Sequence, residues 1–136
     1  MWTLEVQATF SAAHFLPNHP KCGDMHGHNY TVCVVVAANG LDWSGMMIDF
    51  GTLKALVQDA IGAWDHRCLN ELAEFKDTPP TAEIMASLVF MKLRRRTSDW
   101  QEIWIQSVAI EETPGCIATY YGDTIHGEVK DVQPRA

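Results

Sequence analysis

The chain has 136 residues, close to the ~150 residues of a common single domain, so we expect one domain. Its composition, 47% hydrophobic and 20% charged residues, is typical of a folded protein and excludes a disordered one. A net charge of −7 argues against general binding to nucleic acids or anionic membranes, because both need a positive protein surface. The longest apolar run, residues 32–38, is far shorter than the ~18 residues of a membrane helix, and residues 1–10 do not resemble a signal peptide. We therefore expect a cytoplasmic protein.

The first two predicted elements are strands. Residues 2–10 alternate between apolar and polar side chains, which is the period of a half-buried strand. After a loop rich in proline, asparagine and glycine, residues 26–38 form a second β-rich stretch. It ends at Asn39-Gly40, a turn signal.

Two helices are predicted to follow. From Asp49, which can act as the N-cap, apolar residues recur at helical spacing as far as Trp64. The prolines at 79–80 break the chain, and Thr81 can cap a second helix that runs to three arginines at 94–96. We interpret these arginines as a solvent-exposed last turn, because positive charge suits the C-terminal end of a helix dipole.

The remaining chain is predicted to return to β structure. Residues 103–112 form a strand, 113–115 a turn and 116–121 a returning strand. The order ββααββ indicates an α+β fold, with an antiparallel sheet and both helices on one face. We expect this domain to span residues 1–122, followed by a polar C-terminal tail at 123–136.

Three histidines are the strongest candidates for a metal site. His26 and His28 are two residues apart, so on a strand they project from one face, and a hairpin would bring His14 beside them. Three imidazoles suit zinc and leave a fourth position for water or substrate, as in a catalytic site. Surface or hydrogen-bonded histidines are the ordinary alternative for an H-x-H pair. His19 and His126 lack such partners, and we interpret both as loop residues.

The four cysteines form no CxxC pair, which argues against a zinc ribbon, a redox motif and a disulfide framework. Three of them are interpreted as small buried hydrophobic residues: Cys33, Cys68 and Cys116. Cys22 differs, because it lies in a polar loop after Lys21 and four residues before His26. A nearby cation and a metal both favour the thiolate, which acts as a base or nucleophile. Two alternatives stay open: a fourth zinc ligand in a closed structural site, or an inert thiol.

Two further positions carry candidate carboxylates. Asp65 precedes His66, and a carboxylate beside an imidazole can orient it for general acid or base catalysis. In the strand at 103–112, Glu112 shares the parity of the apolar residues, whereas Glu111 falls on the other parity. A carboxylate that continues an apolar stripe is either a frayed strand end or an anchor for a ligand with adjacent N–H groups, such as a heterocycle.

Six motifs together resemble the 6-pyruvoyl-tetrahydropterin synthase family. They occur in the family's order between about Thr9 and Tyr121: FSAAH (10–14), CGDMHGHNY (22–30), MIDFGTLK (47–54), DHRCLN (65–70), PTAE (80–83) and EET (111–113). The three residues between Cys22 and His26 resemble the spacing of the bacterial 6-carboxy-5,6,7,8-tetrahydropterin synthases of the queuosine pathway, whereas animal-type pyruvoyl enzymes have a longer gap. Trp64 and the tail at 123–136 depart from the family pattern.

The resemblance implies a tunnelling fold (T-fold), in which ββααββ subunits join edge to edge into an oligomeric β-barrel, usually a hexamer made of two trimers. It also implies Zn2+ held by His14, His26 and His28. It further implies that Cys22 is the general base and that Asp65 and His66 form the partner acid/base pair. Glu112 is the implied anchor for the amino-pyrimidine edge of a pterin.

The implied activity is conversion of 7,8-dihydroneopterin triphosphate to 6-carboxy-5,6,7,8-tetrahydropterin, with release of triphosphate and acetaldehyde, in 7-deazaguanine and queuosine biosynthesis. One alternative is a 6-pyruvoyl-tetrahydropterin synthase, which stops after triphosphate elimination. Another is a non-catalytic, zinc-stabilised oligomer that binds pterins. The presence of both Cys22 and the Asp65-His66 pair argues against the last, because a structural metal site needs no distant acid/base pair. The expected partners are the small-molecule pterin triphosphate and further copies of the chain.

Overall fold

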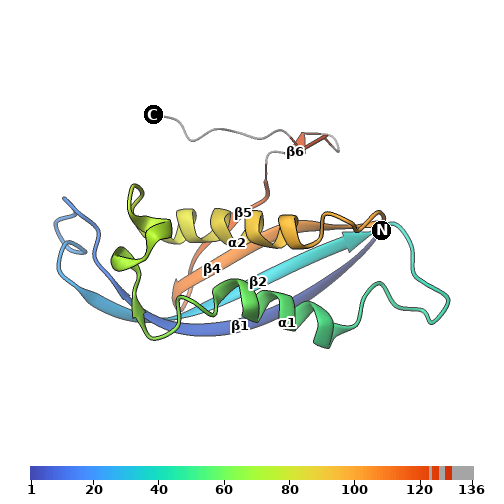
Figure 1. Ribbon diagram of the computed structural model, residues 1–136, viewed down its shortest axis with the longest axis horizontal. Helices are drawn as coiled ribbons and strands as arrows, with labels where there is room; N and C mark the ends of the chain where they lie inside the picture. The colour runs from blue at the N-terminus through green and yellow to red at the C-terminus, as the bar shows by residue number, and fades with distance from the viewer. Residues whose placement is uncertain (123, 126–127, 130–136) are drawn as a thin grey trace.

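The computed structural model describes residues 1–122, 124–125 and 128–129 (Figure 1). Five strands form one sheet: β1 (Trp2–His14), β2 (His26–Ala38), β3 (Arg67–Cys68), β4 (Ile103–Thr113) and β5 (Cys116–Tyr120). Their order across the sheet is β3-β1-β2-β4-β5. Helices α1 (Phe50–Ile61) and α2 (Ala82–Arg96) cover one face of this sheet, which confirms the predicted α+β arrangement (Figure 1).

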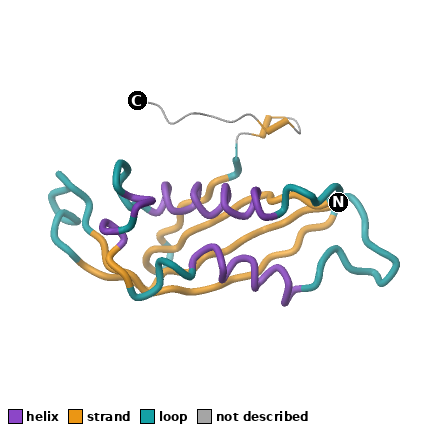
Figure 2. Tube along the Cα trace, viewed as in Figure 1, coloured by secondary structure: helices purple, strands orange, loops and turns teal. Residues whose placement is uncertain are grey.

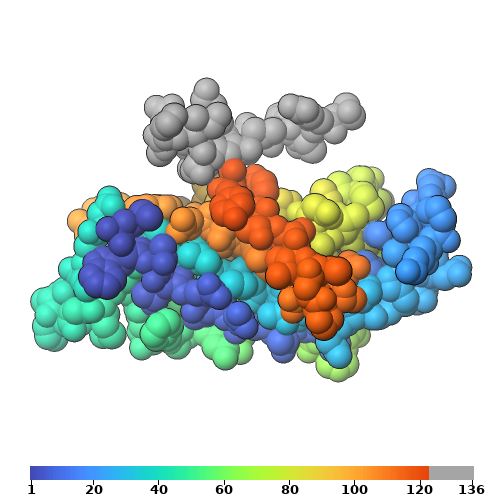
Figure 3. All heavy atoms as spheres, turned by 180° about the vertical axis from the view of Figure 1, so that it is seen from behind, coloured from blue at the N-terminus to red at the C-terminus, as the bar shows by residue number. Residues whose placement is uncertain are grey.

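Strands β1 and β2 form a long antiparallel hairpin, in which Trp2 pairs with Ala38 and His14 pairs with His26. The alternation predicted for the first strand extends to its last residue, because the even-numbered side chains from Val6 onward are buried beneath the helices. The odd-numbered side chains point to the opposite face, where strands rather than helices form the surface (Figure 3). We call the two sides of the sheet the helix face and the open face, and we refer to the latter also as the open side.

Strand β3 was not predicted from the sequence pattern. It is two residues long and pairs parallel to β1, with Arg67 opposite Ala12 and Cys68 opposite Ala13, so the sheet is mixed at this edge. Two short 3₁₀ helices follow it, η1 (Leu69–Glu71) and η2 (Ala73–Phe75). This segment reaches the end of the sheet where β1 finishes and β2 begins, beside the loop of residues 15–25 (Figures 1 and 2).

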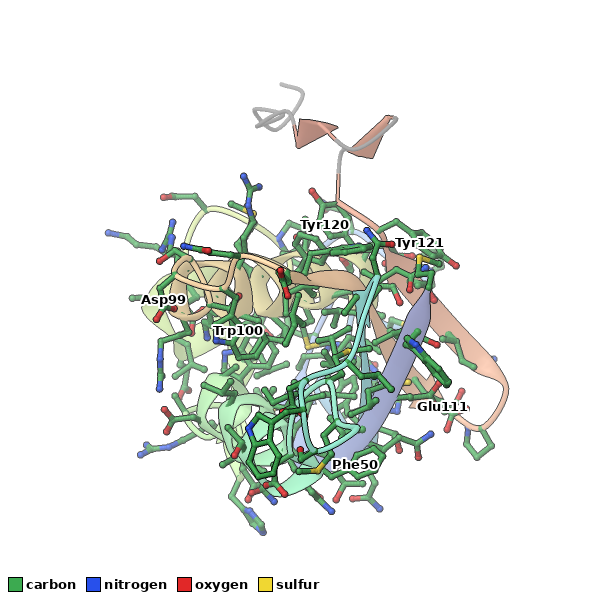
Figure 4. All side chains as sticks on the ribbon, turned by 90° about the vertical axis from the view of Figure 1, so that its right-hand side faces the viewer. Phe50, Asp99, Trp100, Glu111, Tyr120 and Tyr121 are labelled. Carbon is green, nitrogen blue, oxygen red and sulfur yellow. The ribbon has the colours of Figure 1, made fainter. Side chains whose placement is uncertain are left out.

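Both helices begin at the predicted caps. The Asp49 carboxylate accepts from the backbone N–H of Thr52, and the Thr81 hydroxyl accepts from that of Ile84. The last turn of α2 carries the three arginines, as predicted. The prediction for α1 was wrong at both ends of its apolar stripe: the side chain of Phe50 is exposed (Figure 4), and the helix ends at Ile61, before the buried Trp64.

The core lies between the helix face and the two helices. Leu53 and Val57 of α1 and Leu93 of α2 are fully buried in one hydrophobic cluster that also contains valines of β2. Truncating one such leucine to alanine costs about 2–5 kcal/mol in other proteins, so this layer holds the sheet rigid. No helix in the described part of the chain is long and apolar enough to cross a membrane.

The predicted tail at 123–136 lies mostly outside the described residues. Within it, the structure describes two paired two-residue strands, β6 (Thr124–Ile125) and β7 (Glu128–Val129). His126 lies outside the described residues.

Candidate active site

Three histidines converge on the helix face at the end of the β1–β2 hairpin. His14 is fully buried, and His26 and His28 are half-buried. One ring nitrogen from each lies within 4.8 Å of the other two. The two strands place them there because His14 pairs with His26, and His28 follows two residues later on the same side of β2. The metal-ligating group predicted from the sequence is therefore assembled in space.

Hydrogen bonds to backbone carbonyls fix the tautomers of two of these rings. The Nδ1 of His14 is 2.8 Å from the Pro80 carbonyl oxygen, and the Nδ1 of His26 is 2.8 Å from the Asp24 carbonyl oxygen. A carbonyl only accepts, so each Nδ1 carries a proton and donates it. In the neutral rings the Nε2 atoms then hold lone pairs, and they face each other at 3.1 Å. A cation between the two rings would turn this repulsion into coordination.

The third ring has a buried nitrogen with no hydrogen bond. The Nε2 of His28 is buried without a hydrogen-bond partner in the described structure, although a carboxylate oxygen of Glu112 lies 3.5 Å away. Burial lowers the pKa of His28, and the neighbouring His14 and His26 lower it further, against the opposing effect of Glu112. Neutral imidazole is the metal-binding form. The two Nε2 lone pairs of His14 and His26, together with the unbonded Nε2 of His28, fit a zinc ion with an open coordination position.

Glu111 and Glu112 point to opposite sides of the sheet. The register of β4 against β5 shifts between Glu111 and Thr113, so Glu112 lies at a bulge in the strand. Glu112 faces the histidine cluster and the buried Tyr30, whose pKa is raised by burial and then by this carboxylate. Glu111 lies on the open side (Figure 4), where its carboxylate accepts from the backbone N–H of Gly115. Strand parity predicted this division.

Cys22 lies in the loop between β1 and β2 and is half-buried. Among the described residues, the cluster of possible metal ligands contains the three histidines and does not include its thiol. The geometry thus gives no support to the alternative in which Cys22 completes a closed structural site. The loop of residues 15–25, which contains Cys22, lies at the same end of the sheet as the cluster (Figure 1).

Asp65 and His66 lie at the sheet edge on the open side. The Nδ1 of His66 is 3.0 Å from the Asp65 carboxylate, and the same oxygen accepts from the backbone N–H of Ser11 at 2.9 Å. Chiefly the Ser11 N–H, and then His66, lower the pKa of Asp65, so this carboxylate is ionised and can orient the ring. The backbone N–H of His66 also donates to the Ser11 carbonyl, which anchors the pair to β1.

The ring of His66 is 83% exposed and lines an open hollow of about 490 Å³ behind the histidine cluster. Ser11 and Asn29, on the open face, line the same hollow, and so does His28 of the histidine cluster. In the described part of the chain, no hydrogen bond or ion pair joins Asp65 or His66 to the three histidines. One chain therefore brings the three histidines and Glu112 into contact, whereas Asp65 and His66 make no bond with them in the described structure.

Sequence reasoning missed two supports of this site. The indole N–H of Trp64 donates to the Glu74 carboxylate at 3.1 Å, and Lys92 reaches the same carboxylate and lies 4.6 Å above the indole ring. This group fixes the chain immediately before Asp65. The amide of Asn70 both accepts from and donates to the backbone of Phe15, at 2.9 Å each, and so holds the residue after His14. No periodic pattern marks either set, because its members are far apart in sequence.

The fold and this site belong to a known class of pterin enzymes. The family model for 6-pyruvoyl tetrahydropterin synthase matches residues 3–123. The chain therefore belongs to the 6-pyruvoyl tetrahydropterin synthase family and is an enzyme of the pterin-synthase type. This confirms the resemblance inferred from the six motifs.

Individual relatives narrow the comparison. A putative 6-carboxy-5,6,7,8-tetrahydropterin synthase of Archaeoglobus fulgidus is 37% identical over 91 residues, covering 67% of this chain and 75% of the relative. The 6-carboxy-5,6,7,8-tetrahydropterin synthase of Bacillus subtilis is 32% identical, covering 84% of this chain and 73% of the relative. The solved 6-pyruvoyl tetrahydropterin synthase of Caenorhabditis elegans is 34% identical, with a TM-score of 0.80 over 90% of this chain and 96% of that one. These comparisons confirm the T-fold and the enzyme class.

Proposed function

We propose that the protein converts 7,8-dihydroneopterin triphosphate to 6-carboxy-5,6,7,8-tetrahydropterin, releasing triphosphate and acetaldehyde, in 7-deazaguanine and queuosine biosynthesis. The observation that carries the proposal is the group of three buried and half-buried histidines, whose ligand nitrogens lie within 4.8 Å of one another beside the Glu112 carboxylate. The bacterial spacing between Cys22 and His26, together with relatives named 6-carboxytetrahydropterin synthase, favours the carboxy product.

The metal in this proposal is zinc, held by His14, His26 and His28. When bound, zinc supplies a Lewis acid that stabilises negative charge developing on the side-chain oxygens of the substrate. The carbonyls of Pro80 and Asp24 keep two of the rings aimed at the ion. The chemistry is proton transfer and elimination, so it requires no redox cofactor.

Glu112 would bind the amino-pyrimidine edge of the pterin. A carboxylate accepts from two adjacent N–H groups in a bidentate pair, and such charge-assisted bonds are about twice as strong as neutral ones. Its position beside His28 would place the pterin side chain toward the three histidines. Glu111, turned to the open side, cannot share this role in the same chain.

Cys22 would act as the base that removes the proton from the side-chain carbon next to the pterin ring. His66, oriented by the ionised Asp65, would return or relay protons as the elimination proceeds. A thiol and an imidazole can exchange protons near neutral pH, which suits successive enolisation steps.

The separation of Asp65 and His66 from the metal cluster supports a site shared between subunits. His66 is largely exposed on the open side, where a second copy of the chain can approach it. We propose that edge-to-edge pairing of the sheets brings the His66 of one copy to the histidine cluster of its neighbour in a hexamer of two trimers. Such pairing also covers the exposed edges of the sheet. Light scattering should then give about 91 kDa, six times the 15.2 kDa of the chain.

We further propose that residues 1–122 form the catalytic domain and that the enzyme works in the cytoplasm. The four cysteines of the described structure are free thiols, a state that the reducing cytoplasm maintains.

Identification of the products tests the proposed reaction. The zinc-loaded protein is incubated with 7,8-dihydroneopterin triphosphate, aldehydes are trapped with a hydrazine, and the pterin is identified by mass. Acetaldehyde and 6-carboxytetrahydropterin in equal amounts are expected. Triphosphate release without acetaldehyde would favour the pyruvoyl alternative, which the 34% identity to the C. elegans enzyme keeps open. Release of neither would indicate a pterin-binding oligomer.

A further inference from the structure

The loop that carries Cys22 is closed on itself by backbone hydrogen bonds. Residues 16–19 form a turn in which the N–H of His19 donates to the Leu16 carbonyl at 3.2 Å. Pro17 and Asn18 occupy its two central positions, and Asn18 has φ +66°, as the third residue of a type II turn requires. The N–H of Leu16 then donates to the Cys22 carbonyl at 2.8 Å. The start of the loop is thereby joined to the residue that bears the thiol.

The side chain of His19 binds the backbone directly at Cys22. Its Nδ1 accepts from the N–H of Cys22 at 2.8 Å and from the N–H of Lys21 at 3.2 Å. Both bonds need a lone pair on Nδ1, so the ring is neutral and carries its proton on Nε2. This is the arrangement by which a side chain caps the first free N–H groups of a turn.

Gly23 shows how closely the chain passes His19. A Cβ on Gly23 would lie 2.8 Å from the His19 carbonyl oxygen, a distance that side-chain carbons essentially never show. Residues on both sides of Cys22 are thus held against the same histidine, by hydrogen bonds before it and by close backbone contact after it. The Cys22 backbone is therefore held by His19 at its N–H and by Leu16 at its carbonyl.

We propose that His19 is a positioning residue for Cys22, acting through its Nδ1 atom; the inference rests on the proposed role of Cys22 as the base. The sequence pattern had assigned His19 to an ordinary loop. A base must lie within hydrogen-bond reach of the proton it abstracts, and small displacements of a reacting group cost activity steeply. Holding the backbone N–H groups of Lys21 and Cys22 supplies this precision without any contact between His19 and the substrate.

Three substitutions at position 19 test the atom that the proposal names. His19→Ala removes the acceptor, His19→Gln moves it one bond further out, and His19→Asn keeps an oxygen in the place of Nδ1. We expect His19→Ala and His19→Gln to lower kcat by roughly 10- to 100-fold with little change in KM. His19→Asn should recover most of kcat. Zinc content, measured by elemental analysis, and Tm should stay close to those of the native protein, because His19 is exposed and binds only the loop.

Alkylation of Cys22 by iodoacetamide, followed by peptide mass spectrometry, gives a readout that does not depend on turnover. We expect His19→Ala and His19→Gln to raise its rate roughly three- to tenfold, because the loop opens more often, and His19→Asn to restore it. Native kcat and native alkylation in His19→Ala would overturn the proposal, as would an His19→Asn protein as impaired as His19→Gln. A fully active Cys22→Ala protein would refute the catalytic role of Cys22 instead, while the alkylation rates would still decide the role of His19.

Discussion

One end of the sheet presents two different surfaces. On the helix face, His14, His26, His28 and Glu112 are buried or half-buried and closely packed. On the open side, Asp65 and His66 form a hydrogen-bonded pair in solvent, with His66 83% exposed. The groups that orient the histidine rings also differ. Backbone carbonyls orient His14 and His26, whereas the Asp65 carboxylate orients His66.

The long β1–β2 hairpin carries the three histidines of the helix face, whereas Asp65 and His66 lie just before β3. Desolvation keeps His28 neutral and leaves its Nε2 unbonded, which suits coordination of a cation. Exposure leaves His66 free to approach a group outside its own chain. Under the proposed function, one chain would carry two halves of a catalytic site, on opposite faces of the sheet.

The largest effect is expected from His28→Ala on the helix face. Loss of one of three ligands should release the metal and reduce activity by about 10⁴-fold or more, since a Lewis acid contributes several kcal/mol to transition-state stability. The matched control is His66→Ala, which should retain one zinc per chain. Elemental analysis of both variants provides the measurement. Equal loss of zinc in the two variants would contradict the division between the faces.

Substitution of the proposed base should separate metal binding from turnover. Cys22→Ala is expected to keep its zinc and to lose about 10³-fold in kcat, within the range of general-base contributions. Zinc analysis and steady-state kinetics of the same preparation test this. A Cys22→Ala protein without zinc would show that the thiol is a metal ligand.

Glu111 and Glu112 are adjacent in sequence but lie on opposite faces of the sheet, so substituting each in turn tests which face binds the pterin. Glu112→Gln should weaken pterin binding by about 10²-fold, the amount expected for a lost charge-assisted hydrogen bond, and should raise KM. Glu111→Gln, on the open side, should leave KM nearly unchanged. Kinetics with the triphosphate substrate compare them. The reverse result would move the pterin anchor to the open side.

The smallest effect is expected at Cys33, a thiol on the open face of β2. Burial and then a hydrogen bond with Glu5 raise the pKa of Cys33 to about 12. Raising a thiol pKa from 9.0 to about 12 lowers the thiolate fraction at pH 8 by about 10³-fold, so iodoacetamide should leave Cys33 unmodified while Cys22 reacts. Cys33→Ala should keep kcat/KM within about twofold. Rapid alkylation of Cys33 in the native protein would refute this.

The sequence predicted the helix face better than the open side, for a physical reason. Strand alternation has a period of two, so the parity of His14, His26, His28 and Glu112 alone places them on one face. Asp65 depends on β3, a two-residue pairing with no periodic signal, and on Ser11, 54 residues away. The capping bonds made by His19 escaped prediction because loop hydrogen bonds depend on conformation rather than on spacing.

The predicted apolar stripe of α1 was wrong at its two ends for a related reason. Helical spacing correctly marked Leu53 and Val57 as buried, but the same pattern included Phe50, which is exposed, and Trp64, which lies beyond the end of the helix. Trp64 is buried by Phe10 and Phe75 instead. Tertiary packing at the ends of a helix overrides its periodicity.

The shared site is tested most directly by mixing two inactive variants. His28→Ala lacks an intact helix face and His66→Ala lacks an intact open side, so each alone should be nearly inactive. When differently tagged copies are coexpressed and hybrid oligomers are purified, a neighbouring pair can combine one intact helix face with one intact open side. Random assembly then predicts about one quarter of native activity in the hybrids. Hybrids as inactive as either parent would show that each site is built within a single chain and would contradict the account.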